Sequence, residues 1–194
     1  MTYGLNLILG TVSETMVTAY GLYYKIQQFI LFAAFGLRDA VTPIVAYSHG
    51  MQNKTRIQDG VKYGMIYTCI IMIIGTVIVE SCAVPFSNIF GLSGETQSLC
   101  ISAMHIVSIC FIFSGINITF QGIFQALDGG IESLIISVCR QILFVLPVAW
   151  GFAQLAKQSL YFAWLVWLTF PIAEALTAFI AFCLFRKISK KKLA

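Results

Sequence analysis

The stretch LCISAMHIVSICFIFSGINITFQGIFQAL, residues 99–127, decides what kind of fold this chain can adopt. It runs for 29 positions without an aspartate, glutamate, lysine or arginine. A helix needs roughly 20 mostly apolar residues to cross the hydrocarbon core of a bilayer. A second stretch, residues 158–185, carries one charge in 28 positions, at Glu174. Two segments of this kind predict an integral membrane protein.

The composition of the whole chain supports the same interpretation. Hydrophobic residues make up 59% of the sequence and charged residues 10%, whereas charged residues are about 25% of an ordinary soluble domain. The chain therefore lacks the polar residues that the surface of a soluble core requires. The net charge of +4 comes from basic residues in short connections and in the tail, so we expect no nucleic acid partner. The basic tail is either a topology signal or a contact with anionic lipid.

The lengths of the apolar runs predict five full spans and one partial one. The full spans are residues 16–37, 61–86, 99–127, 133–156 and 158–185. Residues 1–12 are too short to span and resemble the latter half of a helix, so we expect a fragment, a split gene product or a mis-called start. The predicted fold is an all-α, polytopic membrane helix bundle, with residues 1–194 as a single membrane domain.

The charges of the connections predict how the spans are oriented. The connection at 48–62 and the tail after Phe185 are basic, whereas the connections at 86–98 and 155–159 carry few charges. Placing 48–62, 128–132 and the C-terminus in the cytoplasm satisfies the positive-inside bias and the alternation of spans, although 128–132 is itself acidic. We therefore expect a multi-pass plasma-membrane protein with a cytoplasmic C-terminus.

The motifs that mark common enzymes do not occur in the sequence. There is no GxSxG, HExxH, P-loop or GxGxxG motif, so we expect no enzymatic activity. The six cysteines have no CxxC spacing and the two histidines lie far apart, which predicts neither a metal site nor a cofactor. Without a P-loop, any transport would depend on a coupling ion, H⁺ or Na⁺.

Ionisable and polar side chains within the spans are candidates for function, because hydrocarbon penalises them. Glu174 follows Pro171 near the middle of the last span. It is either a residue that couples transport to a proton or ion, or a structural glutamate that is hydrogen-bonded at the proline. Tyr20, Tyr24 and Gln28 are four residues apart and share one helix face, which we expect to point into the bundle as part of a substrate cavity.

A polar stripe runs along the charge-free span. It consists of Ser114, Asn117, Gln121 and Gln125. Their spacing of three, four and four places them on one helical face. Amides that faced lipid would be costly, so the stripe must meet other helices or a watery cavity. Hydrogen bonding between helices and contact with a substrate or ion both remain open.

The stretch FGLRDAVTPIVAYSHG, residues 35–50, is predicted to be the cytoplasmic end of a spanning helix. Adjacent residues on a helix point about 100° apart. Arg38 and Asp39 are therefore predicted to be poor partners for each other and to find different neighbours near the inner mouth. We interpret them as residues at the edge of a gate, or as anchors.

Two longer stretches resemble a known family. VTAYGLYYKIQQFILFAAFGLRDAVTPIVAYSHGMQNKTRI, residues 17–57, and FQGIFQALDGGIESLIISVCRQILFVLPVAW, residues 120–150, are similar to parts of MATE (multidrug and toxic compound extrusion) transporters. The first, with K-x-Q-x-F and F-G-L-x-x-x-x-x-P-I-x-A-Y, resembles their eighth helix and its cytoplasmic loop. The second, with F-Q-A-L and S-x-x-R-Q-x-x-x-x-x-P, resembles the join of the tenth and eleventh helices. The resemblance covers essentially the whole chain.

The resemblance implies a twelve-helix antiporter in two six-helix lobes, of which this chain is the carboxy-terminal lobe. Family members expel cationic, often aromatic compounds in exchange for protons or sodium ions. The implied partners are thus small organic cations, membrane lipid and an amino-terminal lobe missing from this chain. In one branch a coupling carboxylate lies in the tenth helix, where this chain has Asn117 and Gln121. Arg38 and Asp39 also depart from the small or amide residues usual at their positions.

The expected function is therefore the ion-coupled export of drugs or other organic cations across the plasma membrane. The polar stripe of residues 114–125 and the tyrosines of the eighth helix would line the cavity between the lobes, where aromatic rings can receive cations. One alternative is a lipid-linked oligosaccharide flippase of the same superfamily. Another is a non-transporting membrane subunit or an inactive fragment.

Overall fold

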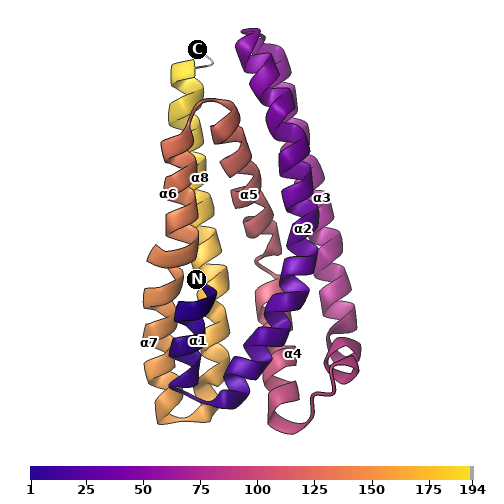
Figure 1. The fold of residues 1–194 in the computed structure, drawn as a ribbon, viewed down its shortest axis with the longest axis vertical. Coiled ribbons are helices and arrows are strands. Elements are labelled where there is room, and N and C mark those ends of the chain that lie inside the picture. The colour runs from indigo at the N-terminus through magenta and orange to yellow at the C-terminus, as the bar shows by residue number, and fades with distance from the viewer. Residues whose placement is uncertain (193–194) are drawn as a thin grey trace.

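The computed structural model describes residues 1–192, which fold into a bundle of long helices (Figure 1). The α-helices are α1 (Thr2–Gly10), α2 (Glu14–Gly50), α3 (Lys54–Ile89), α4 (Gly94–Ser108), α5 (Phe111–Ala126), α6 (Gly130–Val138), α7 (Val145–Gln158) and α8 (Thr169–Lys192). A π-helical turn, η1 (Cys139–Leu143), joins α6 to α7, and a 3₁₀ segment, η2 (Leu160–Leu168), precedes α8. The predicted all-α membrane bundle is confirmed.

Within residues 1–192, four helices have the length and apolar character to cross a bilayer, and a bent pair of helices makes a fifth when it is counted as one span. Four are continuous: Glu14–Gly50, Lys54–Ile89, Gly130–Lys157 and Tyr161–Lys190. The fifth is the pair α4 and α5, which meet at a bend of 54°. Residues 99–127 are therefore not one straight span, as the charge-free run suggested, but two helices separated at Ile109 and Cys110. The length of an apolar run does not report whether the backbone within it is continuous.

The connection at 48–62 is much shorter than predicted. α2 continues through Pro43 to Gly50 and α3 begins at Lys54, so only residues 51–53 form the turn. The side chain of Asn53 accepts a hydrogen bond from the backbone N–H of Arg56 at 3.1 Å and caps α3. A helix can continue beyond the hydrocarbon as long as its backbone hydrogen bonds are made, so the end of the apolar run did not mark its end.

α5 is the central helix of the bundle, and most of its residues are buried. It packs against α2, α3, α6 and α8. Small residues allow the close contacts: a methyl group at Gly115 would lie 2.5 Å from Met72 Cγ, and one at Gly122 would lie 2.5 Å from Arg38 Cγ. The polar residues of α5 are therefore held within reach of several other helices.

Two prolines explain distortions near the middle of the bundle. Pro147 has no N–H to donate to the carbonyl of Leu143, and its ring crowds that carbonyl. The π-helical turn Cys139–Leu143 ends at this position. Pro171 similarly follows the 3₁₀ segment η2 and lies in the first turn of α8, where a proline is tolerated. Both distortions lie close in sequence to ionisable residues, Arg140 and Glu174.

The two ends of the bundle gather different connections. The α2–α3 turn, the α5–α6 turn and the C-terminal end of α8 lie at one end, and the α1–α2, α3–α4 and α7–η2 connections lie at the other (Figure 1). At the first end, His49 Nε2 lies 3.4 Å from Asp128 Oδ2 and links α2 to the α5–α6 turn. This grouping is the one that the predicted alternation of spans requires. The side chains of Lys191 and Lys192, part of the basic tail, lie outside the described residues.

Candidate functional site

A buried ion pair joins two of the helices that prolines distort. The Nε of Arg140 donates to Oε1 of Glu174 at 2.6 Å. The side chains are 11% and 8% exposed, respectively. Arg140 lies in the π-helical turn η1, and Glu174 lies in α8 three residues after Pro171. π-helical turns often occur at functional sites, because they redirect side chains that a regular helix would place elsewhere.

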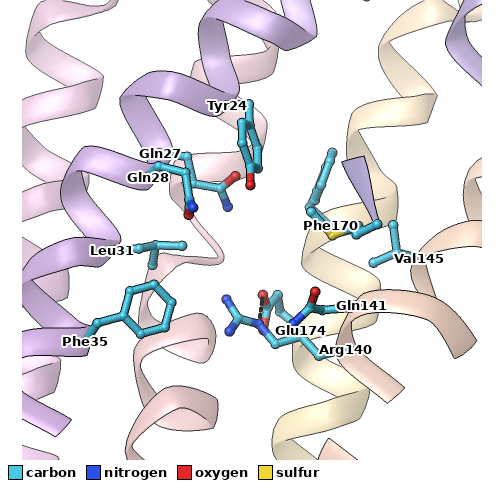
Figure 2. A pocket seen from close by; sticks show the side chains of 11 residues that line it. Tyr24, Gln27, Gln28, Leu31, Phe35, Arg140, Gln141, Val145, Phe170 and Glu174 are labelled. Carbon is cyan, nitrogen blue, oxygen red and sulfur yellow. Dashed lines mark hydrogen bonds and ion pairs between the residues drawn. The ribbon is translucent and has the colours of Figure 1, made fainter. Parts of the chain in front are cut away.

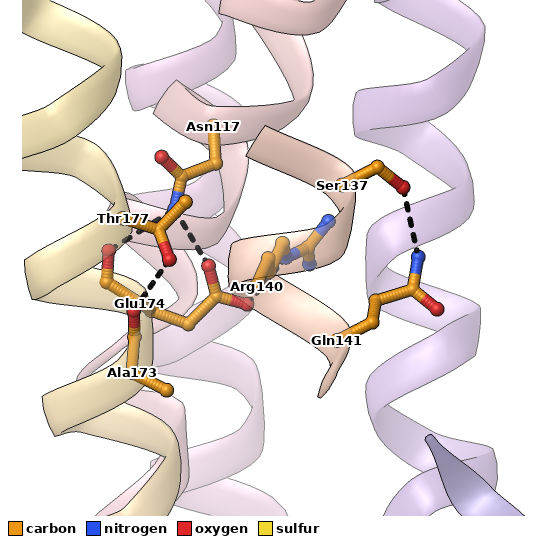
Figure 3. A network of polar contacts seen from close by, with 7 residues as sticks. All are labelled: Asn117, Ser137, Arg140, Gln141, Ala173, Glu174 and Thr177. Atoms are coloured by element: carbon orange, nitrogen blue, oxygen red, sulfur yellow. Dashed lines mark hydrogen bonds and ion pairs between the residues drawn. The ribbon is translucent and has the colours of Figure 1, made fainter. Parts of the chain in front are cut away.

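Asn117 of α5 completes the surroundings of the carboxylate (Figure 3). Its Nδ2 donates to Oε2 of Glu174 at 2.7 Å and to the backbone carbonyl of Glu174 at 3.0 Å. Each carboxylate oxygen thus has its own donor. A buried ion pair is tolerated when such extra hydrogen bonds satisfy the remaining lone pairs. The carboxyl group connects α5, η1 and α8 at one point.

The ion pair lies at the wall of a cavity of about 120 Å³. Figure 2 shows Tyr24, Gln27 and Gln28 of α2 on the opposite side from Arg140 and Glu174. Leu31, Phe35, Gln141, Val145 and Phe170 complete the labelled lining. The cavity therefore combines amide, phenol, guanidinium and carboxylate groups with aromatic rings, inside a bundle that has the length and apolarity to span a membrane. Polar linings of this kind hold water or small polar ligands.

The structure brings together three of the residues proposed from the sequence. Glu174, Tyr24 and Gln28 all line the cavity. Tyr20, on the same face of α2, is fully buried beside the cavity, and its ring stacks on that of Phe170 with centroids 6.1 Å apart. The expectation that this face points into the bundle agrees with these positions. A role in binding substrate stays a prediction.

The polar stripe of α5 takes a different place. Ser114, Asn117 and Gln121 are buried, and Asn117 contacts Glu174. Gln125 is exposed and donates to the hydroxyl of Ser133 at 3.1 Å. None of the four lines the cavity of Figure 2. The contacts of Asn117 and Gln125 are hydrogen bonds to other segments of the bundle, and contact of the stripe with a substrate stays a prediction.

The expectation that Arg38 and Asp39 avoid each other is wrong. Arg38 donates to Oδ1 of Asp39 from Nε at 2.9 Å and from Nη2 at 2.7 Å. The arginine side chain is long enough to bend back along the helix, so the 100° between neighbouring Cα–Cβ directions does not separate the charged ends. The pair is partly exposed, and the guanidinium also lies 5.2 Å from the centre of the Phe35 ring. Its proposed place at a gate stays a prediction.

Three further polar residues line the cavity but were not predicted as site residues: Arg140, Gln27 and Gln141. Arg140 lies within the predicted span 133–156, so the rule that selected Glu174 applies to it equally. Arg140 and Gln141 are also the R-Q of the S-x-x-R-Q-x-x-x-x-x-P pattern, and Pro147 at its end accompanies the π-helical turn.

Comparison with known proteins agrees with the sequence resemblance. The family model MatE matches residues 1–150. The multidrug export protein MepA of Staphylococcus haemolyticus (strain JCSC1435) is 24% identical over 181 residues, which are 91% of this chain and 37% of that protein. MepA of Staphylococcus aureus (strain NCTC 8325 / PS 47) is 27% identical over 158 residues, 76% of this chain and 34% of its own length.

Solved structures show the same fold. A multidrug resistance MATE family transporter of the MOP superfamily, in an outward-facing conformation, superposes with a TM-score of 0.88 at 19% identity. The match covers 99% of this chain and 43% of that one. A MOP superfamily transporter from Pyrococcus furiosus, described as having a binding pocket of reversed polarity, matches with a TM-score of 0.85. The chain thus spans well under half the length of the transporters it matches. By its family model, fold and relatives, this chain belongs to the MatE family.

Proposed function

We propose that this chain is the carboxy-terminal lobe of a transporter that exports drugs, chiefly organic cations, in exchange for an inward-moving ion. The observation that carries the proposal is the buried Glu174–Arg140 pair at the wall of a polar cavity within the bundle. A carboxylate in this position can bind a proton or cation, which an ion-driven exporter needs. The relatives described as multidrug export proteins support export as the direction of transport and drugs as the class of substrate.

The charges around the cavity suggest how ion and substrate would exclude each other. With Glu174 ionised, its charge and that of Arg140 cancel. When Glu174 is protonated, the charge of +1 on Arg140 is no longer neutralised, and it repels an organic cation. A proton on Glu174 therefore opposes binding of a cationic drug near the cavity. Mutually exclusive binding of this kind is what an antiporter requires.

The size of the cavity favours a small ligand in this state of the lobe. Drug-sized ligands occupy pockets of about 300–1,000 Å³, and this cavity has a volume of about 120 Å³. We therefore assign the coupling ion, a proton or a sodium ion, to the cavity at this volume. The drug would bind in a larger space, formed when the lobe opens or where it meets an amino-terminal lobe. Tyr24 and Phe35 at the cavity wall would offer ring faces to an organic cation.

The proposed location is the plasma membrane, with the C-terminus in the cytoplasm. The α2–α3 turn and the end of α8 lie at one end of the bundle (Figure 1), and the basic residues cluster in these two regions. Such clusters remain on the cytoplasmic side during insertion. The flippase alternative has less support, because the cavity pairs its arginine with a carboxylate and is not basic overall.

Ethidium efflux tests the proposal. Cells that express the complete transporter containing this chain should expel ethidium, and a proton or sodium ionophore should stop them. Glu174→Gln should abolish ion-driven efflux, measured per amount of protein in the membrane, because loss of the ion pair also lowers stability. Glu95→Gln, at an exposed acid in the first turn of α4, is the matched control and should keep normal efflux. Undiminished, ionophore-sensitive efflux by Glu174→Gln would exclude Glu174 as the coupling residue.

A further inference from the structure

A second cluster of ionisable and hydroxyl groups lies between α3 and α4, apart from the cavity described above. Oε2 of Glu80 contacts Nδ1 of His105, and Oε1 of Glu80 accepts a hydrogen bond from the hydroxyl of Ser108. The side chains of His105 and Glu80 are 45% and 36% exposed. Unlike Glu174, this carboxylate therefore has direct access to its surroundings. Neither His105 nor Glu80 was among the site residues predicted from the sequence.

The position of the cluster along the helices makes lipid an unsuitable environment for it. Glu80 lies nine residues before the end of α3 at Ile89, a distance of about 14 Å at the helical rise of 1.5 Å per residue. α3 has 36 residues and is about 54 Å long, which exceeds the roughly 30 Å of a hydrocarbon core, so the pair lies near the edge of that core. Ionisable groups at this depth face water or another protein surface. Exposure to water at this depth gives protons a path to Glu80 and His105.

The same cluster attaches α3 to the break in the fifth span. Ser108 is the last residue of α4, and α5 begins at Phe111 after a bend of 54°. The hydroxyl of Thr76, also on α3, donates to the backbone carbonyl of Ser108 at 3.1 Å. The last four carbonyls of a helix need partners of this kind. The last turn of α4 is thus attached to α3 through His105, the Ser108 hydroxyl and the Ser108 carbonyl.

We propose that Glu80, His105 and Ser108 form a second proton-binding site, whose occupancy controls how firmly α3 holds the break between α4 and α5. An ionised Glu80 can accept a hydrogen bond at each oxygen, one from His105 and one from Ser108. A proton taken up by the pair of ionised Glu80 and neutral His105 makes the imidazole an imidazolium, so the His105–Glu80 contact becomes a charge-assisted hydrogen bond that holds α4 more firmly. Among the described side chains, including those of α2 and α5, neither Glu80 nor His105 has a further ion-pair partner.

Histidine NMR tests the pairing directly, because the chain contains two histidines. The purified chain, labelled with ¹⁵N in its histidine rings, is reconstituted in lipid nanodiscs, and His49→Asn assigns the two sets of signals. Glu80→Gln should change the ring signals of His105 and leave those of His49 unchanged. Glu95→Gln and Glu174→Gln should change neither set. Unchanged His105 signals in Glu80→Gln would overturn the proposal.

Amide hydrogen exchange tests the link to the break. Loss of one contact should speed exchange of residues 105–113 roughly two- to tenfold, since a hydrogen bond contributes about 0.5–1.5 kcal/mol and 1.4 kcal/mol is tenfold in an equilibrium constant. In the wild-type chain, exchange corrected for the intrinsic effect of pH should fall when the pair takes up a proton, because the His105–Glu80 contact is then charge-assisted. In Glu80→Gln it should be fast at every pH. Exchange that is the same in both proteins throughout would overturn the proposal.

Two further variants remove the same contacts from the other helix, so the test does not depend on Glu80→Gln folding. Ser108→Ala should speed exchange while the His105–Glu80 pairing signals persist. His105→Gln should speed exchange and reduce its dependence on pH. Normal, pH-dependent exchange in both variants would contradict the proposed site. Neither experiment measures transport, so the outcome is independent of whether the drug-export proposal holds.

Discussion

Glu174 and Arg140 form a buried ion pair, in which each side chain neutralises the charge of the other. Both are nearly inaccessible, and they approach to 2.6 Å. Removing two charges from water costs several kcal/mol per ion, and their attraction offsets this only while both are present. The pair is thus weak evidence for stability. It is stronger evidence for a place where a change of one charge has a large effect, as transport coupled to an ion requires.

Removing either member of the pair should therefore destabilise the protein more than removing both. Arg140→Gln leaves a buried carboxylate and Glu174→Gln leaves a buried guanidinium, and each should lower the free energy of unfolding by about 3–5 kcal/mol. The double variant should cost less than either single variant. Equilibrium unfolding of the purified chain in mixed detergent micelles measures all three.

Glu95→Gln is the matched control, because Glu95 is exposed, and it should change the free energy by less than about 0.5 kcal/mol. A double variant whose cost equals the sum of the single costs would mean that the two side chains do not interact energetically.

α5 owes its central position to residues without bulky side chains. It crosses α3 where Gly115 faces Met72 and Thr68, and it crosses α2 where Gly122 faces Arg38 and Thr42. Small residues let helix backbones approach closely in a bilayer, where packing and interhelical hydrogen bonds drive association. This close approach also brings Asn117, between the two glycines in sequence, to Glu174.

A methyl group at Gly115 should separate α5 from α3. It would lie 2.5 Å from Met72 Cγ and 2.8 Å from Thr68 Cγ2, neither of which is the free end of a flexible chain. Gly115→Ala should thus cost about 1–3 kcal/mol through overpacking. Gly36→Ala is the control, because nothing lies within 4 Å of its added methyl group. It should be neutral or stabilising by up to about 1 kcal/mol, from helix propensity. Equal effects in detergent unfolding would refute this account of the packing.

The bundle as a whole presents two chemically different ends. Residues 51–53 and the end of α8 share one end, and residues 89–94 lie at the other (Figure 1). The first end carries Lys54, Arg56 and Lys62 on the first turns of α3, and Arg186 and Lys187 on the last turns of α8. Because insertion favours such residues on the cytoplasmic side, the proposed cytoplasmic orientation of this end rests on these charges.

Labelling of single cysteines should reveal this arrangement. In a background whose six cysteines are replaced by alanine, Ser93→Cys should react with a membrane-impermeant maleimide added to intact cells. Gln52→Cys should react only in inside-out vesicles. Both positions are exposed, so accessibility to the reagent depends on the side of the membrane. Reaction of Gln52→Cys from outside would reverse the proposed orientation, and reaction of both from the same side would contradict the arrangement of the helices.

The sequence by itself determined that the chain is an all-α membrane bundle, and it indicated the approximate spans, the family and Glu174 as an unusual residue. These follow from local properties: the length of each apolar run, the scarcity of charge, and motifs whose residues are close together. The energy of transfer into hydrocarbon depends on composition alone, so no knowledge of neighbours was needed.

Only the tertiary structure decided which side chains contact each other. Arg140 and Glu174 are 34 residues apart and Asn117 and Glu174 are 57 apart. Their meeting depends on the close packing around α5 and on distortions beside Pro147 and Pro171. The bend between α4 and α5 likewise lies within an unbroken apolar run. Side-chain pairing is set by the angles and separations of helices that are distant in sequence. A one-dimensional pattern does not contain these quantities, so it identified the charged residue without its partner.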